Sequence, residues 1–278
     1  MNRLVYRQES QRVELVNLSS AEATQSQQSE ESVQDFVLRI DDRSDRKFKL
    51  NQNDNITLGK QMLEDNVYRG AVLEGIPATY AQTVEIINNI IPAKSSLNPA
   101  QINEIVSLKR AWEYVLNKDN LTTKATAVNL VLVKEIHAII GANMNSLNPE
   151  QVGNLRTTPI FVGGVKTHDF GIPVADEVQS ELVALNDFKD PVICALEVFL
   201  YLCKKQMFRD GNKRTANLVA NFLLIQSGAG LISIKEELVP DFKVLLIDWY
   251  DNRNKKDIMN FLLNRCYIYN YVGKAFLD

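Results

Sequence analysis

The sequence has few of the residues that build metal centres and disulfide frameworks. It contains three cysteines and two histidines among 278 residues. Cys194, Cys203 and Cys266 are odd in number and lie within apolar, helix-like patterns, so we expect buried thiols in a reducing compartment. His137 and His168 are too few for a usual zinc site without cysteine ligands.

Long apolar runs and a large excess of charge are also absent. No run reaches the roughly 18 residues needed to span a bilayer, and the N-terminus lacks the pattern of a signal peptide. The net charge of −3 argues against a general nucleic-acid binder, although it leaves local basic patches open. With 45% hydrophobic and 23% charged residues, the chain can bury a core and stay soluble. Because it shows neither a membrane-spanning run nor a signal-peptide pattern, we expect a cytoplasmic protein.

The first 54 residues differ in composition from the remainder. Residues 19–32 (SSAEATQSQQSEES) are polar and of low complexity, which is typical of a flexible loop. The flanking segments VELV (13–16) and FVLRI (36–40) are either two strands of a small hairpin or part of a disordered tail. We therefore treat residues 1–54 as an N-terminal extension and residues 55–278 as the main domain.

From residue 55 onward, the apolar spacing predicts an all-α bundle. The run 191–207 is apolar on nearly every side, which indicates the central buried helix. Residues 158–170 differ, since TPIFV, Gly163-Gly164 and VKTHDF predict a short β-hairpin. The predicted helices span residues 56–75, 100–117, 124–140, 173–188, 191–207, 213–228, 240–252 and 255–270.

The segment QMFRDGNKRTAN (206–217) contains the break between the predicted helices 191–207 and 213–228. Asp210-Gly211-Asn212 is ordinary turn chemistry, but Lys213 and Arg214 then begin a helix, where the helix dipole disfavours positive charge. Either an anion such as phosphate binds there or the segment is a solvated corner. His137 lies on an apolar helix face, which favours a hydrogen-bonded core histidine over a catalytic one.

This segment resembles the signature of the Fic family, which reads His-x-Phe-x-(Asp or Glu)-Gly-Asn-Gly-Arg-x-x-Arg. Upstream, GAVLEGIPATY resembles the inhibitory helix of Fic proteins that carry their own brake, within residues 58–75. GNLRTTPIFVGG followed by GIP resembles the family's target-docking flap, at Ile160, Phe161, Val162 and Gly163. The residues in the frame of the signature are Gln206, Phe208, Asp210, Gly211, Asn212, Lys213, Arg214 and Asn217.

The resemblance covers residues 55–278 and implies an all-α Fic fold with a β-hairpin flap. Most Fic proteins transfer AMP from ATP to a hydroxyl of a target protein, whereas relatives of the Doc toxin phosphorylate their target. By resemblance, Asp210 holds Mg²⁺, and Gly211, Asn212 and Lys213 cradle the phosphates of ATP or another nucleotide. Arg214 neutralises the leaving phosphates, Phe208 belongs to the catalytic loop, and Glu74 is the inhibitory residue.

The chain departs from the signature at several positions. Gln206 replaces the histidine base, and losing a positioned base typically costs roughly 10²–10⁴-fold in rate. Lys213 replaces a glycine, as in the Doc-like loop. Asn217 replaces the second arginine, and Gly70 stands where self-inhibited relatives carry Ser or Thr. Glu74 must then pair with Arg214 or Lys213, or it is a surface carboxylate at a helix end.

Two kinds of function fit these residues. One is a transferase with weak or absent AMP transfer, or a Doc-like protein phosphotransferase. The other is an inactive module that binds a nucleotide or a protein. The resemblance extends to bacterial Fic-like sequences with Gln at the base position, and the likeness to the Doc toxin implies a toxin–antitoxin-like context. It also implies a protein target bound through the flap, no direct contact with nucleic acid or membrane, and leaves a homo-oligomer open.

Overall fold

The computed structural model describes residues 50–90, 92, 96–123, 127–165, 170–251 and 254–269. These residues all belong to the second of the two units into which the chain divides, Met1–Ser44 and Asp45–Asp278. The segments predicted for the N-terminal extension, including 13–16, 19–32 and 36–40, lie outside the described residues.

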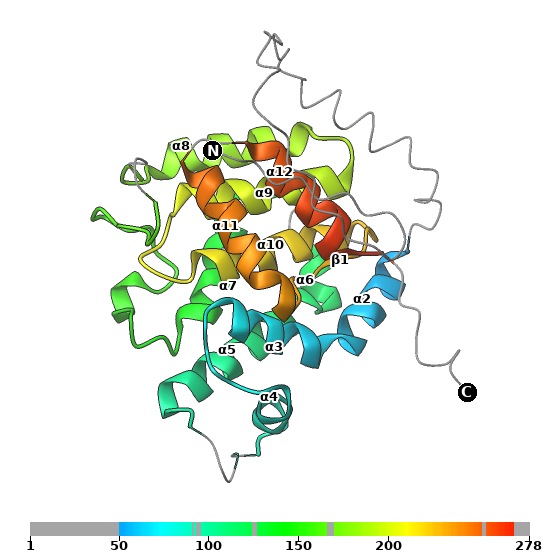
Figure 1. Ribbon diagram of the computed structural model, residues 1–278. Helices are drawn as coiled ribbons and strands as arrows, with labels where there is room; N and C mark the ends of the chain where they lie inside the picture. Colours follow the sequence, from blue (N-terminus) through cyan, green and yellow to red (C-terminus); the bar gives the residue numbers. More distant parts are fainter. Residues whose placement is uncertain are drawn as a thin grey trace, which may run out of the picture. The chain divides into compact units, whose positions relative to one another are not determined.

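The described residues form the helical bundle that the sequence predicts (Figure 1). None of their helices combines the length and the apolar character that crossing a membrane requires. The α-helices are α2 (Gln52–Gln61), α3 (Leu63–Leu73), α4 (Tyr80–Ile87), α5 (Pro99–Val115), α6 (Lys118–Thr123), α7 (Leu130–Gly141), α8 (Ala175–Ala184), α9 (Pro191–Lys205), α10 (Asn212–Gln226), α11 (Val239–Tyr250) and α12 (Lys255–Phe261).

The centre of the bundle is the pair α9 and α10, which pack along each other (Figure 1). Helix α9 begins well because Asp190 accepts hydrogen bonds from the N–H groups of Val192 and Ile193, and Pro191 occupies the first turn. Its apolar side chains are buried on nearly every side, which confirms the predicted central helix. Phe222 of α10 is likewise fully buried, and burial of such a side chain stabilises the fold by about 1.5–3 kcal/mol.

Helices α5 and α7 pack against α10, and α3 packs against α5. Helix α5 begins at Pro99 after a capping box between Asn98 and Gln101, close to the predicted start. The single helix predicted over residues 56–75 is wrong, because the chain leaves helical geometry at Met62 and forms α2 and α3. The predicted stop at Gly75 is confirmed by its positive φ of 78°.

The strands lie where the sequence did not predict them. β1 (Leu231–Ile232) pairs antiparallel with β2 (Tyr267–Ile268), which follows a π-helical turn over Leu262–Cys266. No strand is assigned to residues 158–165, so the predicted first arm of the hairpin is wrong. The turn at Gly163-Gly164 does form, with the N–H of Val165 bonded to the carbonyl of Val162 at 3.3 Å. Residues 166–169, which include His168, lie outside the described residues.

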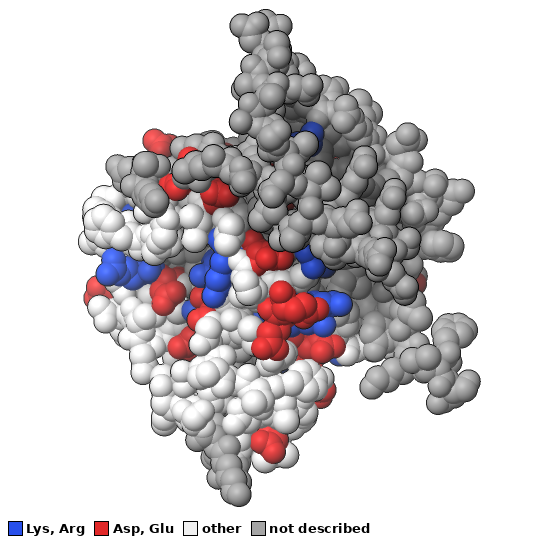
Figure 2. All heavy atoms as spheres, in the orientation of Figure 1, with Lys and Arg blue, Asp and Glu red and all other residues white. Residues whose placement is uncertain are grey.

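Acidic and basic side chains are interleaved on the face of the molecule in Figure 2. Among the described residues of that face, neither sign of charge gathers into a separate patch. This distribution agrees with the small net charge and offers no extended basic surface on this side.

Candidate active site

The loop between α9 and α10 is shaped by two residues with left-handed backbone conformations. Gln206 ends α9 with φ 48°, and Gly211 precedes α10 with φ 78°. A Cβ added at Gly211 would lie 3.5 Å from the ring of His137 and from Met144. Because these distances are ordinary van der Waals contacts, a side chain would fit, and glycine suits this position because of its positive φ. The loop turns sharply here and sets the N-terminus of α10 against a cavity.

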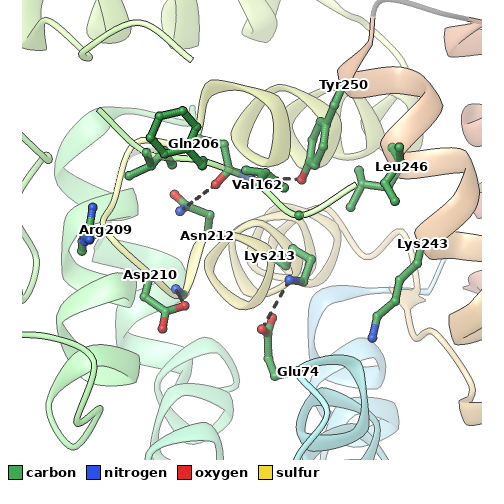
Figure 3. Close-up of a pocket in the computed structure, with 15 residues that line it drawn as sticks. Glu74, Val162, Gln206, Arg209, Asp210, Asn212, Lys213, Lys243, Leu246 and Tyr250 are labelled. Atoms are coloured by element: carbon green, nitrogen blue, oxygen red, sulfur yellow. Dashed lines mark hydrogen bonds and ion pairs between the residues drawn. The ribbon is translucent and has the colours of Figure 1, made fainter. Parts of the chain in front are cut away.

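This cavity has a volume of about 670 Å³ and is formed by four parts of the chain (Figure 3). Its wall combines the α9–α10 loop, the end of α3, the segment that carries the predicted flap, and α11. The described residues that line it are Glu74, Ile160, Phe161, Val162, Gly163, Gln206, Arg209, Asp210, Gly211, Asn212, Lys213, Lys243, Leu246, Ile247 and Tyr250. The structure therefore brings together most of the site residues predicted from the sequence.

Gln206 lines the cavity, but its amide is already hydrogen-bonded. Nε2 donates to the carbonyl of Cys203 at 2.6 Å and to the hydroxyl of Tyr250 at 3.1 Å, and Oε1 accepts from Nδ2 of Asn212 at 3.1 Å. If the amide were turned over, its oxygen would face the carbonyl of Cys203 and its NH₂ group would face the NH₂ group of Asn212, and neither pair can form a hydrogen bond. One lone pair of Oε1 can still accept a hydrogen bond, but a neutral amide cannot take up a proton.

Two other predicted site residues hold the loop together. The side chain of Asn212 bonds both backbone groups of Phe208, accepting from its N–H at 2.9 Å and donating to its carbonyl at 2.8 Å. Phe208 itself is buried and does not line the cavity. Its ring stacks on His137 with centroids 3.7 Å apart. Phe208 therefore anchors the loop from behind and is not placed to touch a bound substrate, contrary to its predicted catalytic position.

His137 is the hydrogen-bonded core histidine that the sequence favours. Nδ1 accepts from the N–H of Gly153 at 2.9 Å, so Nε2 carries the proton and donates to the carbonyl of Asp210 at 3.0 Å. Burial lowers the pKa of His137 from 6.5 to about 4, and the nearby Arg214 acts in the same direction. A neutral His137 thus ties α7 to the loop without taking part in proton transfer.

We expect the fold to lose stability as the pH falls from about 6.5 toward 4, because the unfolded chain then binds a proton that the folded His137 does not. The loss should reach about 2 kcal/mol between pH 7.5 and pH 5. Urea unfolding at a series of pH values measures it. In His137→Gln, which can still bond Gly153 and Asp210, this part of the pH dependence should vanish. Equal slopes in the two proteins would contradict the assignment.

Asp210 is half-exposed at the mouth of the cavity. One carboxylate oxygen accepts from the hydroxyl of Ser146 and the other from the N–H of Gly211, both at 2.6 Å. These bonds hold the side chain in place and leave lone pairs on both oxygens. Ser146, in the segment after α7, was not predicted from the sequence.

Glu74 faces the N-terminus of α10 across the cavity (Figure 3). Oε2 lies 3.4 Å from Nζ of Lys213, and Oε1 lies 3.8 Å from Nε of Arg214. The side chain is only 13% exposed, so the alternative of a surface carboxylate is wrong. The predicted pairing of Glu74 with Lys213 and Arg214 is confirmed as ion pairs. Gly70 and Asn217, two departures from the family signature, lie together on a small cavity of about 20 Å³ beside Arg214.

Arg214 is not the solvated helix-start arginine that a simple corner would require. Its side chain is 3% exposed, and Nη1 lies 2.7 Å from Oε2 of Glu104 on α5. Nη2 lies 3.8 Å from Oδ1 of Asp210. The pairing with Glu104 was not predicted, since 110 residues separate the two positions and only the packing of α5 on α10 joins them.

The segment of the predicted flap forms one wall of the cavity and is held by a buried arginine. Arg156 donates to the carbonyls of Gln206, Thr158, Phe170 and Gly171. It thereby ties the two ends of the flap segment to the end of α9. Phe161 is fully exposed at the rim. The sequence contained Arg156 within the flap pattern but gave no sign of these contacts.

Comparison with known proteins agrees with this geometry. The sequence profile of the Fic/DOC family matches residues 127–224, a range that includes the loop between α9 and α10. It is similar to the protein adenylyltransferase Fic of Nematostella vectensis, with 25% identity over 242 residues, covering 82% of this chain and 52% of that protein. Protein adenylyltransferase fic-1 of Caenorhabditis briggsae is 29% identical over 173 residues, covering 58% of this chain and 32% of that protein.

Solved structures show the same fold. Residues 134–508 of Fic-1 from C. elegans superpose with a TM-score of 0.58 and 22% identity, covering 73% of this chain and 59% of that one. A Fic domain-containing signaling protein from Bacteroides thetaiotaomicron gives a TM-score of 0.59 and 18% identity, covering 76% of this chain and 84% of that one. The chain spans about half the length of the Nematostella protein and about a third of the Caenorhabditis briggsae protein.

Proposed function

We propose that this chain binds a magnesium nucleotide, ATP or a related donor, and transfers AMP or another phosphate-containing group to a hydroxyl of a target protein. Glu74 acts as a brake on that reaction. The observation that carries the proposal is the N-terminus of α10, which opens on the cavity at Gly211 to Lys213 with the carboxylate of Glu74 opposite. The adenylyltransferase names of the relatives support AMP as the transferred group.

The N-terminus of α10 has the properties of a phosphate site. The amide groups in the first turn of a helix have no helical partner, and the helix dipole favours an anion there. Lys213 adds a cation at the cavity wall, and Lys243 of α11 lines the same cavity (Figure 3). Glu74 then stands where the negative charge of a bound phosphate would lie, and its pairing with Lys213 competes with binding.

Asp210 fits a single-carboxylate magnesium site. Mg²⁺ is usually held in such enzymes by one or two carboxylates together with substrate phosphates. Among the described residues, no cluster of three or more His, Cys, Asp or Glu could hold a metal by itself. Bound at Asp210, the metal would offset negative charge on the phosphate oxygens. Ser146 and Gly211 keep the carboxylate in position for that role.

Proton transfer is the weak part of this site. Gln206 can hold the attacking hydroxyl, or a water, by a hydrogen bond to Oε1 but cannot accept its proton. Tyr250 does not replace the missing base, because burial holds the pKa of its hydroxyl well above its ordinary value. His137 lies behind the loop, with both ring nitrogens already bonded. We therefore expect AMP transfer to be weak or absent unless the target supplies an acceptor.

Lys213 favours a second candidate function, a Doc-like protein phosphotransferase. Its ammonium group stands at the cavity wall, where the family's AMP-transfer loop has a glycine. An added cation can change which phosphate of the donor lies at the reacting position. ATP labelled at the α-phosphate or the γ-phosphate separates the two reactions, and binding without transfer of either label identifies an inactive module.

The protein target would dock at the flap, where Ile160 to Gly163 line the cavity and Phe161 is exposed at the rim. Aromatic side chains are enriched in protein interfaces, so the exposed Phe161 is suited to contact a partner chain. A cytoplasmic location and a toxin–antitoxin-like context stay predictions from the sequence.

Glu74→Gly should bind Mg-ATP about tenfold more tightly than the unchanged protein, because the substitution removes a carboxylate from the phosphate site. A tenfold change in the dissociation constant corresponds to about 1.4 kcal/mol. Isothermal titration calorimetry measures both constants. Glu74→Gln, which keeps the shape but not the charge, should give part of the gain, and Glu64→Gln on the same helix should give none. Absence of binding in every variant would overturn the nucleotide proposal.

A further inference from the structure

Arg214 is surrounded by carboxylates from three parts of the fold. Glu104 belongs to α5, Glu74 ends α3, and Asp210 lies in the loop before α10. The three contacts are unequal. Glu104 lies 2.7 Å from Nη1, whereas Glu74 and Asp210 each lie 3.8 Å from the guanidinium. Only the contact with Glu104 is a hydrogen bond.

The distances show that Nη1 of Arg214 is hydrogen-bonded to Glu104, whereas Nε and Nη2 have only distant carboxylate neighbours. Nε and Nη2 form the edge of an arginine that can bind two oxygens of a phosphate in parallel. Nε of Arg214 is buried without a hydrogen-bond partner, and so is the nearest oxygen of Glu74, Oε1. A buried charged donor in this condition is costly. Arg214 does not itself line the cavity, whereas Glu74 does, so a phosphate reaches this edge only when the carboxylate of Glu74 moves away.

We infer that Glu104 is a positioning residue for the phosphate site. It fixes Arg214 through Nη1 and thereby presents the Nε–Nη2 edge to a phosphate, while Glu74 covers that edge only until a phosphate binds. This inference rests on the proposed function and names the residue that keeps its phosphate-binding arginine in place.

The position of Glu104 suits this role. Helix α5 is long, begins with a capping box and packs against α3, α7 and α10, so its side chains have a firm base. The Glu104 side chain is only 20% exposed, which limits screening of the ion pair by water. The Glu104 carboxylate also compensates the charge of the buried guanidinium. The contact with Glu74 alone would not do so once a phosphate displaced it.

The test uses Glu74→Gly as the parent, since its phosphate site is uncovered. Adding Glu104→Ala should weaken Mg-ATP binding about tenfold in calorimetry, because Arg214 loses its fixed orientation. Adding Glu104→Gln should leave the affinity close to that of the parent, since the amide oxygen still accepts from Nη1. Glu113→Ala, which removes an exposed carboxylate from the same helix, is the matched control and should change nothing.

To separate positioning of Arg214 from a purely structural role of Glu104, Glu104→Ala is repeated in a protein that lacks Arg214. In Arg214→Lys, Glu104→Ala should cause a much smaller loss of affinity, because the two residues act as a unit.

Tighter binding after Glu104→Ala would show a second brake and overturn the inference, as would unchanged binding. If Glu104→Ala does not fold, Glu104→Asp replaces it, and its shorter side chain should also weaken binding. Failure of the parent to bind nucleotide would overturn the proposed function and this inference together. Binding by the parent with no effect at position 104 would overturn this inference alone.

Discussion

Gln206→His combined with Glu74→Gly should raise the transfer of AMP by about 10²-fold or more over Glu74→Gly alone. A positioned general base contributes roughly 10²–10⁴-fold, and the proposed function leaves the other parts of the site, including Asp210 and Arg214, in place. Histidine tolerates the left-handed backbone conformation at this position better than most residues. Its ring would lie beside Asn212 and Tyr250, which now hold the amide.

Self-modification with ATP labelled at the α-phosphate measures this gain without a known target. Gln206→Asn in the same background is the control, because it keeps an amide and supplies no base. Lys213→Gly is a third change for the case in which the lysine displaces the α-phosphate from the reacting position. If neither the double nor the triple variant gains transfer while nucleotide still binds, the site is not an AMP transferase that has lost only its base.

Arg214→Ala in the Glu74→Gly background should weaken Mg-ATP binding at least about 100-fold. On the proposed function, the substitution would remove two charge-assisted hydrogen bonds to phosphate, each contributing about 1.5–3 kcal/mol. It also leaves Glu104 without its partner, so the stability of the fold should fall. Folding would stay intact only if Arg214 were exposed to solvent, but its side chain is 3% exposed.

Two further variants separate binding from folding. Arg214→Lys keeps the charge and should retain more of the fold, but it cannot offer two parallel N–H groups, so most of the affinity should still be lost. Arg110→Ala removes an exposed cation from α5 and should affect neither quantity. Calorimetry gives the affinity and thermal unfolding gives the stability. Undiminished affinity in a folded Arg214→Ala protein would remove Arg214 from the phosphate site.

Local signals in the sequence located much of the fold. Asn98-Pro99 marked the beginning of α5, the continuous apolar run marked α9, and Gly75 marked the end of α3, because each depends on residues next to it in the chain. The break between α2 and α3 at Met62 could not be predicted, because neither Met62 nor a residue next to it is a glycine or a proline. Two-residue strands such as β1 are too short for any alternation of apolar and polar residues, so their pairing depends on tertiary contacts alone.

The candidate site divides in the same way. The loop residues Asp210 to Lys213 and the opposing Glu74 were found because they form contiguous patterns, and the structure places them on one cavity. Glu104 and Tyr250 were missed because each meets its partner only after folding. Tyr250 reaches Gln206 across 44 residues, and nothing in the sequence around either one marks the contact. Phe208 was assigned by position in the signature, but its ring packs inward against His137.

The most direct test of the account is a crystal structure of Glu74→Gly with Mg²⁺ and a non-hydrolysable ATP analogue. The account predicts phosphate oxygens against the backbone N–H groups at the start of α10, the Nε–Nη2 edge of Arg214 on a phosphate, and the metal at Asp210. Nucleotide bound elsewhere, or an empty cavity at saturating concentration with the loop unchanged, would contradict it.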